Sequence, residues 1–322
     1  MQENRILDYI KDVLENMPTD WLNITTHRLD IYDEKLAKTQ FLDQFDILFN
    51  DNNSELSSLI ELPTAYDYIR LGHPLSCILE WGIANLHQIN QKNIISFASE
   101  SIPILAILRK NLLNNKNTRI VYSEELPRFF DAEVLKSVYG YNFNLEIVES
   151  LSEISEFDGS TIFISHQDEI STIDLIPNVD FFVTIYSPLG SILLVNGEKN
   201  KSYISDIQHV RRRETIAMTP INSLVALTSL TEKSPLHIEK STIEKNKGLV
   251  LDSIATITGT TTPALVASSG LSMQYAIMKG LIHDAIEQHP GKAIKFIVPT
   301  NCYGGTNDQA RRVAACLDTV EI

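Results

Sequence analysis

The stretch "NIISFASESIPILAILRKNLLNNKNTRIVYS", residues 93–123, decides the fold class. Its first run, at 93–99, and its last, at 118–123, are short, apolar and rich in β-branched and aromatic residues, as buried strands are. The longer run between them, at 102–115, has the length and composition of a helix. Because a strand, a helix and a strand in this order favour parallel strands joined by a crossover, the sequence predicts an open α/β fold.

The same alternation continues outward from this stretch. It predicts a helix and then four more strands, at 129–140, 144–150, 160–166, 179–187 and 191–197. We therefore expect a parallel-rich sheet with flanking helices. On the other side, residues 1–60 have the apolar spacing of amphipathic helices, which predicts an N-terminal helical arm that ends in the polar stretch "NDNNSELSS".

Residues 214–258 are expected to be helical, with Pro220 at the start of one helix and Pro235 between two others. The alternation then restarts with a strand, a helix, a strand, a helix and the beginning of a further strand, at 264–270, 271–289, 293–299, 308–317 and 319–322. Since two or three strands do not make a stable sheet, we expect this last part to pair with the earlier sheet, with another chain or with residues outside this chain.

Composition limits the classes of partner. The formal net charge of −14 disfavours nucleic acid and anionic membranes, which bind extended basic surfaces. The run Arg211–Arg213 is too short to change this, and we interpret it as a solvated helix edge or an ion-pairing patch. No stretch has the apolar length of a membrane span or an export signal, which predicts a soluble, cytoplasmic protein.

Cysteine and histidine spacing argues against metal and disulfide chemistry. The three cysteines fit neither a disulfide framework nor a metal-ligand pattern, and the eight histidines form no close cluster. We predict a reducing environment and no metal site. Cys302, next to Tyr303, is either a nucleophile or a buried structural thiol, and the second interpretation is favoured because no histidine is tied to it.

Two turns in the last part of the chain have the residues of ligand sites. In "ASSGLSMQ", residues 267–274, serines and a glycine precede a helix, so free N–H groups and the hydroxyls of Ser268 and Ser269 form either a phosphate cradle or a plain N-cap. In "CYGGT", residues 302–306, Tyr303 either presents its ring to a planar ligand that the glycines let approach, or is a packed tyrosine beside a glycine turn.

A third candidate lies near the start of the predicted α/β part. Tyr68 and Arg70 precede a Gly-His-Pro turn and a helix. Residues two apart in an extended segment point to one side, so a hydroxyl and a guanidinium there can grip a phosphate together. The alternative is an ordinary surface arginine.

Together the three segments resemble a known family. Tyr68–Pro74 looks like the Tyr-x-Arg-x-Gly-Asn-Pro segment of the pyridoxal 5'-phosphate (PLP) enzymes of cysteine and methionine metabolism, with His73 in place of asparagine. This group comprises cystathionine γ-synthase, the cystathionine lyases and methionine γ-lyase. Ser268–Ser272 is similar to its Ser-Gly-Met phosphate turn, with Leu271 for methionine, and Cys302–Thr306 contains its Tyr-Gly-Gly-Thr.

The resemblance implies the type I PLP-transferase fold and a role for each motif. In that family the turn amides hold the cofactor phosphate, the tyrosine stacks on the pyridine ring, and Tyr-x-Arg reaches the phosphate from a neighbouring subunit. Tyr303 would be the stacking ring. Ser269, Gly270 and Leu271 would form the phosphate cradle. Tyr68 and Arg70 would be the pair that reaches the phosphate from the neighbouring subunit.

Two positions depart from the family pattern. Glu100 stands where the phosphate turn of a first module would need glycine, and a carboxylate there repels phosphate. Ser187–Gly190 stands where the family continues Ser-x-Thr-Lys, so the lysine that binds the cofactor covalently is missing. We interpret 1–62 as the arm, 63–258 as a degenerate PLP-fold module, and 259–322 as the start of a second module, which ends before its own lysine.

The sequence thus predicts a PLP-dependent lyase or transferase that eliminates or replaces at the β or γ carbon of a sulfur-containing amino acid. The expected partners are this small-molecule substrate and either further copies of the chain or a complementary chain that completes the second module. The rival hypothesis is a non-catalytic scaffold that keeps a degenerate PLP fold for subunit pairing or regulation.

Overall fold

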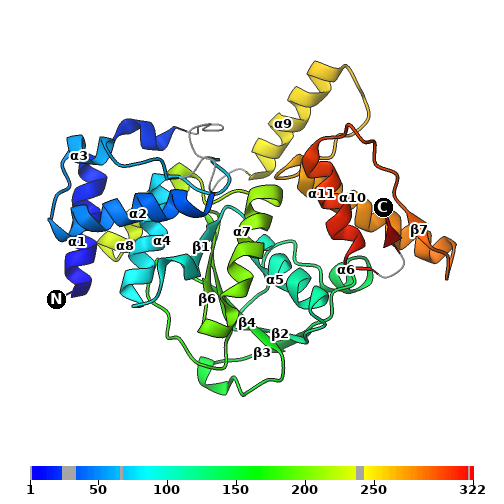
Figure 1. Cartoon of the computed structure of the whole chain (residues 1–322), viewed down its shortest axis with the longest axis horizontal. Helices are drawn as coiled ribbons and strands as arrows, with labels where there is room; N and C mark the ends of the chain where they lie inside the picture. The colour runs from blue at the N-terminus through cyan, green and yellow to red at the C-terminus, as the bar shows by residue number, and fades with distance from the viewer. Residues whose placement is uncertain (1, 24–33, 66–67, 237–242, 318–319) are drawn as a thin grey trace. The chain divides into compact units, whose positions relative to one another are not determined.

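The computed structural model describes residues 2–23, 34–65, 68–236, 243–317 and 320–322 (Figure 1). The chain divides into two compact units, Met1–Leu236 and His237–Ile322. Compact units and repeated modules are different divisions of a chain, so the module boundaries expected from the sequence stay predictions.

The first unit contains a six-stranded sheet in the order β1-β6-β5-β4-β2-β3. Its strands are β1 (Ile94–Phe97), β2 (Thr118–Tyr122), β3 (Asn144–Ile147), β4 (Ser160–His166), β5 (Phe181–Tyr186) and β6 (Gly190–Val195). The neighbours from β3 to β5 pair in parallel, and β6 is antiparallel to both β5 and β1. The predicted parallel-rich α/β fold is confirmed.

The connection between β5 and β6 departs from the parallel pairing of the strands from β3 to β5. Only three residues, Ser187–Leu189, separate the two strands, whereas a parallel crossover needs about a dozen or more. The two strands therefore form a tight antiparallel hairpin.

Helices cover both faces of this sheet. They are α4 (Pro74–Leu86), α5 (Ile102–Leu113), α6 (Ala132–Ser137), α7 (Ser202–Glu214) and α8 (Pro220–Glu232), with short 3₁₀ turns η2 (Gln91–Asn93), η3 (Leu151–Glu153) and η4 (Glu198–Asn200). Pro220 begins α8 as predicted, behind an N-cap threonine.

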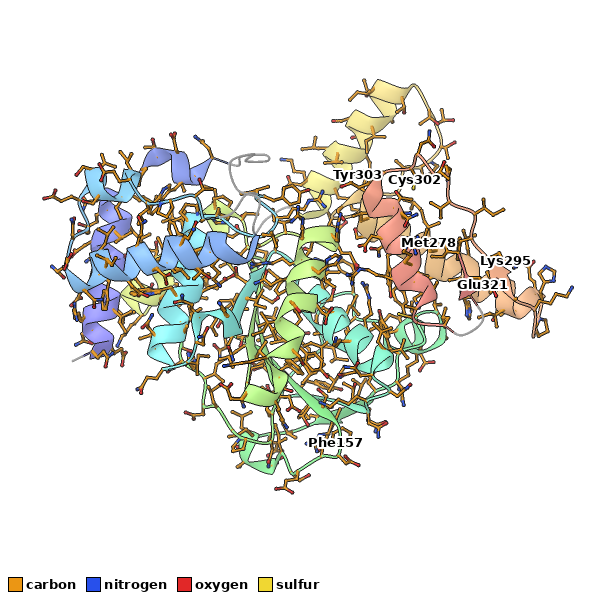
Figure 2. All side chains as sticks on the ribbon, viewed as in Figure 1. Phe157, Met278, Lys295, Cys302, Tyr303 and Glu321 are labelled. Carbon is orange, nitrogen blue, oxygen red and sulfur yellow. The ribbon has the colours of Figure 1, made fainter. Side chains whose placement is uncertain are left out.

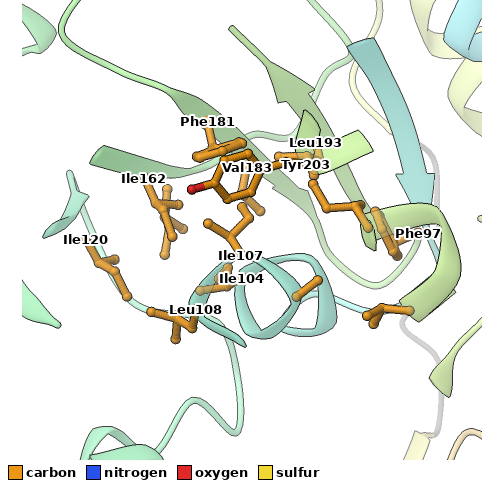
Figure 3. Close-up of a cluster of buried hydrophobic side chains, with 14 of the residues drawn as sticks. Phe97, Ile104, Ile107, Leu108, Ile120, Ile162, Phe181, Val183, Leu193 and Tyr203 are labelled. Atoms are coloured by element: carbon orange, nitrogen blue, oxygen red, sulfur yellow. The ribbon is translucent and has the colours of Figure 1, made fainter. Parts of the chain in front are cut away.

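One face of the sheet forms the main hydrophobic core, shown in Figure 3. Alternate strand residues such as Phe97, Ile162 and Val183 pack against Ile107 of α5 and Tyr203 of α7, and all of these are buried. The period of two in the strands and of 3.6 in the helices brings these side chains to one layer. This core fixes the ends of β1 and β5, after which Glu100 and Ser187 lie.

The N-terminal arm is helical in its described residues, as predicted. It consists of α1 (Gln2–Asn16), η1 (Thr19–Leu22), α2 (Glu34–Asn50) and α3 (Leu56–Ile60). It packs on α4 and α8 through an aromatic cluster in which the rings of Phe45 and Trp81 meet edge to face at 5.1 Å. Trp81 also donates a hydrogen bond to Asp46 at 2.6 Å, which links α4 to the arm.

The second unit is built on two packed helices. Its elements are α9 (Ile243–Thr258), α10 (Gly270–Gln288), β7 (Ile294–Lys295), α11 (Gly304–Ala314) and β8 (Val320–Glu321). The buried residues of α10 recur three and four apart, and this stripe packs against α11 through Ala310 and Val313. The short strands β7 and β8 pair in parallel, and Lys295 and Glu321 form an ion pair at 3.2 Å (Figure 2).

Several sequence-based expectations for this unit are wrong. The predicted strand at 264–270 is irregular up to the start of α10, and Leu265 in it is exposed. The predicted strand at 293–299 is reduced to the two residues of β7. Isolated apolar runs do not remain extended without neighbouring strands to satisfy their backbone, which explains both differences. The final helix begins at Gly304 rather than at 308, so both glycines of the predicted turn lie inside it.

Candidate functional site

The first candidate turn is the N-terminus of α10, where Ser269 is the N-cap. Its hydroxyl accepts from the Ser272 N–H at 3.0 Å, and the Ser272 hydroxyl accepts from the Ser269 N–H at 3.1 Å. This reciprocal pair is a capping box, so the Ser269 hydroxyl is already used by the helix. The plain N-cap interpretation of the serine side chain is therefore correct in this structure.

The backbone of the same turn keeps free donors. The N–H groups of Gly270 and Leu271 occupy the first two helical positions, which have no intrahelical acceptor, and within the described residues neither donates elsewhere. A Cβ placed on Gly270 would meet no atom within 4 Å, so the space beside this turn is open within the second unit. Two amides and the positive end of the helix dipole thus face an accessible region.

The second candidate turn is the N-terminus of α11, where Tyr303 occupies the N-cap position without a side-chain capping bond. Its ring is 69% exposed, and the phenol lies outward beside Cys302 in Figure 2. A Cβ on Gly305 would lie 2.5 Å from the Cε1 atom of Tyr303. The ring therefore lies over the first turn of its own helix, and this close approach explains why residue 305 is glycine.

The structure brings these two turns together. The Cδ1 atom of Leu271, in the first turn of α10, would lie 3.1 Å from a Cβ on Gly305, in the first turn of α11. The N-terminal ends of the two helices are therefore neighbours, and Tyr303 stands beside the turn that begins at Ser269. Amide donors from a helix start and an exposed aromatic face lie within one small region.

The third candidate, Tyr68 with Arg70, lies in the first unit. The predicted extended geometry is wrong, because the Leu71 N–H donates to the Tyr68 carbonyl at 2.9 Å and closes a turn. The side chains are nevertheless close, with the Arg70 guanidinium carbon 5.5 Å from the Tyr68 ring centroid. Arg212 approaches the same ring at 5.3 Å, so the tyrosine lies between two cations.

Arg70 also binds the end of a helix. Its Nη1 donates to the Arg213 carbonyl at 3.3 Å, in the last turn of α7, where cations are favoured by the helix dipole. This hydrogen bond therefore fixes one side of the Arg70 guanidinium against the end of α7.

His73, which replaces the family asparagine, is the N-cap of α4. Its Nδ1 accepts from the Ser76 N–H at 3.3 Å, and its Nε2 lies 2.8 Å from the Met218 carbonyl, so the ring is neutral with its proton on Nε2. Burial lowers the pKa of His73 to about 4. Asparagine and histidine share an acceptor that can cap a helix, which gives the replacement a structural reason.

The segment after Tyr68 also forms one wall of a cavity of about 560 Å³. Gly72 and His73 face it from one side, and Trp21, Phe41 and Leu59 of the arm line the other.

Gly190 and Glu100 are two positions of the first unit where the sequence departs from the family pattern. Gly190 has a φ of +131°, and a Cβ there would overlap the Phe97 carbonyl oxygen and lie 3.0 Å from backbone atoms of Ala98. A lysine at this position would collide with the neighbouring strand. Glu100 lies in the loop before α5, whose N-cap Ser101 makes no side-chain capping bond.

The sequence analysis did not predict a buried cluster of charged side chains inside the first unit. Glu80 of α4 binds Lys38 of α2, Arg211 of α7 at 2.7 Å, and both the N–H and hydroxyl of Ser96 at 2.9 Å. Burial alone would raise the pKa of Glu80, but the two cations outweigh it and lower the pKa to about 2. The cluster joins the arm, a helix and the edge strand β1, which makes it structural.

The interpretation of Arg211–Arg213 as a solvated helix edge is therefore wrong for Arg211, and the ion-pairing alternative is right. Its side chain is fully buried. The signal was present in the sequence, because Tyr203, Ile207, Val210 and Arg211 share one face of the helix at spacings of three, four and seven or eight.

Other site classes receive no support from the described residues. No group of three or more histidine, cysteine, aspartate and glutamate side chains is placed to hold a metal ion in the part of the chain that the structure describes. None of the helices in those ranges is long and apolar enough to cross a bilayer. Cys77 is buried and its thiol pKa is raised to about 12 by burial, while Cys302 and Cys316 are partly exposed.

Comparison with known proteins gives similarity at the level of structure only. No protein-family model matches the chain, and no curated protein matches it. Solved structures do match. A Campylobacter jejuni protein described as an O-acetylhomoserine (thiol)-lyase, carrying N'-pyridoxyl-lysine-5'-monophosphate, is 16% identical with a TM-score of 0.35, covering 69% of this chain and 70% of that one.

Two further solved structures are similar. Cystathionine gamma synthase from Xanthomonas oryzae pv. oryzae, in complex with aminoacrylate and cysteine, is 12% identical with a TM-score of 0.33, covering 62% of this chain and 60% of that one. The metB protein of Corynebacterium glutamicum is 9% identical with a TM-score of 0.32, covering 53% and 54%. Cystathionine γ-synthase belongs to the enzyme group that the three sequence motifs resemble.

Proposed function

We propose that this chain is part of a PLP-dependent enzyme of the transsulfuration type, with its cofactor site at the start of α10 and α11. The observation that carries the proposal is the meeting of two motif turns, because Leu271 of the first contacts Gly305 of the second. The motifs lie about thirty residues apart in sequence, and nothing in local chain geometry requires them to meet.

The residues of the turns fit the chemistry of the cofactor. The N–H groups of Gly270 and Leu271 would hold the phosphate, aided by the helix dipole, while the capping box keeps the turn in shape. The exposed ring of Tyr303 would lie on the pyridine ring, since aromatic faces stack on planar ligands. When bound, PLP supplies an electron sink for the substrate amino acid.

The finer parts of the proposal come from the motif resemblance. The reaction would be β- or γ-elimination or replacement on a sulfur-containing amino acid, in a cytoplasmic homo-oligomer or with a complementary chain. Tyr68 and Arg70 would add phosphate contacts from the first unit of a neighbouring subunit. Arg70 is already oriented by the Arg213 carbonyl, which supports a positioned rather than a freely moving guanidinium.

A titration of PLP into the purified chain, followed by absorbance, tests the site. Gly270→Asp should abolish binding, because the side chain has room and a carboxylate at the first helical position favours the helix but repels phosphate. Gly280→Asp makes the same charge change about 15 Å further along α10, where a Cβ also has room, and should bind like the wild type. Equal affinities in all three proteins would refute the proposed cradle.

The contribution of Arg70 is tested in the same way. Arg70→Ala should weaken PLP binding roughly ten- to a hundredfold, the loss expected for a charge-assisted hydrogen bond away from solvent. Arg70→Lys should recover part of the affinity, because a point charge does not reproduce the two-pronged guanidinium. An unchanged affinity of Arg70→Ala for PLP would mean that Arg70 has a purely structural role.

The second candidate function is a non-catalytic scaffold, and Gly190 favours it for the first unit. The position of the family lysine is closed there to any side chain, so that unit would serve for packing and subunit pairing. Absence of PLP binding to the wild-type chain, in a fold shown intact by circular dichroism, would favour the scaffold.

A further inference from the structure

A second cavity of the first unit, of about 590 Å³, has none of the proposed cofactor residues in its described lining, although Leu71, next to Arg70, is part of its wall. Its walls come from α2, from the turn at Asn90–Asn93 before β1, and from one side of α7. Asn93 is hydrogen-bonded to the Val195 carbonyl at the end of β6, so the cavity lies at the opposite end of that strand from Gly190.

The lining of this cavity is positively charged. Among the twelve described residues that line it, none is acidic and three are lysines, although acidic residues outnumber basic ones by 41 to 27 in the whole chain. Lys92 makes no ion pair with the described residues. Among the residues that the structure describes, Lys201 pairs with Glu198 alone, at 2.7 Å and largely in solvent, where such pairs are weak. Lys38 shares the carboxylate of Glu80 with Arg211.

Two amide oxygens of the lining lack hydrogen-bond donors. Asn93 is 7% exposed, and its Oδ1 is buried without a partner among the described residues. Its orientation is fixed, because its Nδ2 donates to the Val195 carbonyl at 2.6 Å. The Oε1 of Gln208 on α7 is likewise buried and without a donor. Buried acceptors of this kind are satisfied in nearly all proteins, so a ligand with N–H or O–H groups would complete them.

We propose that this cavity binds a small organic anion that carries hydroxyl or amine donors. Lys92 and Lys201 would hold its phosphate or carboxylate, and Asn93 and Gln208 would accept from its donors. The side chain of Ile204 supplies an apolar wall between them on α7. The volume suits a metabolite rather than a polymer. This site is additional to the proposed cofactor turns and does not depend on them.

Calorimetric titration at low salt tests the proposal with two probes that share their hydroxyl groups. Glycerol 3-phosphate presents a phosphate and glycerate presents a carboxylate, so the preferred probe identifies the anionic group. Glycerol, which lacks the charge, should not bind. We expect binding of at least one anion that weakens as salt is raised.

Variants locate the binding. Lys92→Gln and Lys201→Gln should each weaken it about three- to tenfold. Gln208→Glu, which keeps the shape but adds a negative charge, should abolish it. Lys11→Gln removes the same charge from the exposed side of α1 and should have no effect. Failure of both anions to bind, or equal affinity in the wild type, Lys92→Gln and Gln208→Glu, would overturn the proposal.

PLP also carries a phosphate, so the two sites must be separated. Gly270→Asp should bind glycerol 3-phosphate or glycerate as the wild type does, whereas Gln208→Glu should bind PLP as the wild type does. A failed cofactor proposal and a failed cavity proposal therefore give different results.

Discussion

A substitution of Gly190 is the most direct test of whether the first unit excludes a lysine side chain at this position. Gly190→Ala places a methyl group in a backbone conformation of φ +131°, which costs a non-glycine residue about 1–3 kcal/mol. The methyl would also overlap the Phe97 carbonyl, in the strand pair of β1 and β6, so the neighbouring backbone must move. Overpacking of this kind adds about 1–3 kcal/mol, for a total of about 2–6 kcal/mol.

Gly197→Ala is the matched control for this prediction. Gly197 also has a positive φ, of +77°, but nothing lies within 4 Å of its Cβ position, so the substitution costs only the conformational part, about 1–2 kcal/mol. The difference between the two variants isolates the collision with β1.

Urea unfolding followed by tryptophan fluorescence measures both variants. The two tryptophans of the chain, Trp21 and Trp81, lie in the first unit, so this signal reports on the unit that contains both glycines. A free energy of unfolding for Gly190→Ala within about 1 kcal/mol of Gly197→Ala would refute the steric closure, because the expected gap exceeds the accuracy of the extrapolation. It would also reopen position 190 to a cofactor lysine.

Three further predictions follow from the site and its support. Because the pKa of His73 falls from 6.5 to about 4 on folding, stability should be full above pH 6.5 and decrease by about 3 kcal/mol as pH falls to 4, and His73→Asn should keep the helix cap while flattening this part of the pH profile; an unchanged slope would contradict it. Glu80→Gln should cost about 3–5 kcal/mol in urea unfolding because it removes the buried carboxylate that Lys38 and Arg211 share, whereas Glu3→Gln, which removes an exposed partner, should have no measurable effect; equal stabilities would disprove the buried-cluster reasoning. Gly305→Ala should displace the Tyr303 ring and weaken PLP binding several-fold without loss of helix content in circular dichroism, since alanine favours helix over glycine; unaltered PLP affinity would separate the ring position from the cofactor.

Much of the fold follows from local pattern alone. The strands of the first unit, such as β4 and β5, are continuous apolar runs. A run of this kind can be recognised in the sequence, so the positions of these strands are predictable. The starts of α8 and α10 are also predictable from the local sequence, because Pro220 and Ser269 act through the backbone of the next few residues. The motifs that define the candidate turns are likewise contiguous and readable without a structure.

Long-range pairing decided the rest. Residues 264–270 have the composition of a strand but no neighbouring strand, so their backbone does not extend, and no local rule predicts that loss. Glu80, far away in the sequence, provides a counter-charge for the buried Arg211. The approach of Leu271 to Gly305 and the overlap that closes Gly190 depend on how helices and strands pack. Sequence alone determined which turns are candidates for a cofactor site, and tertiary packing decided which of them meet and which position excludes a lysine.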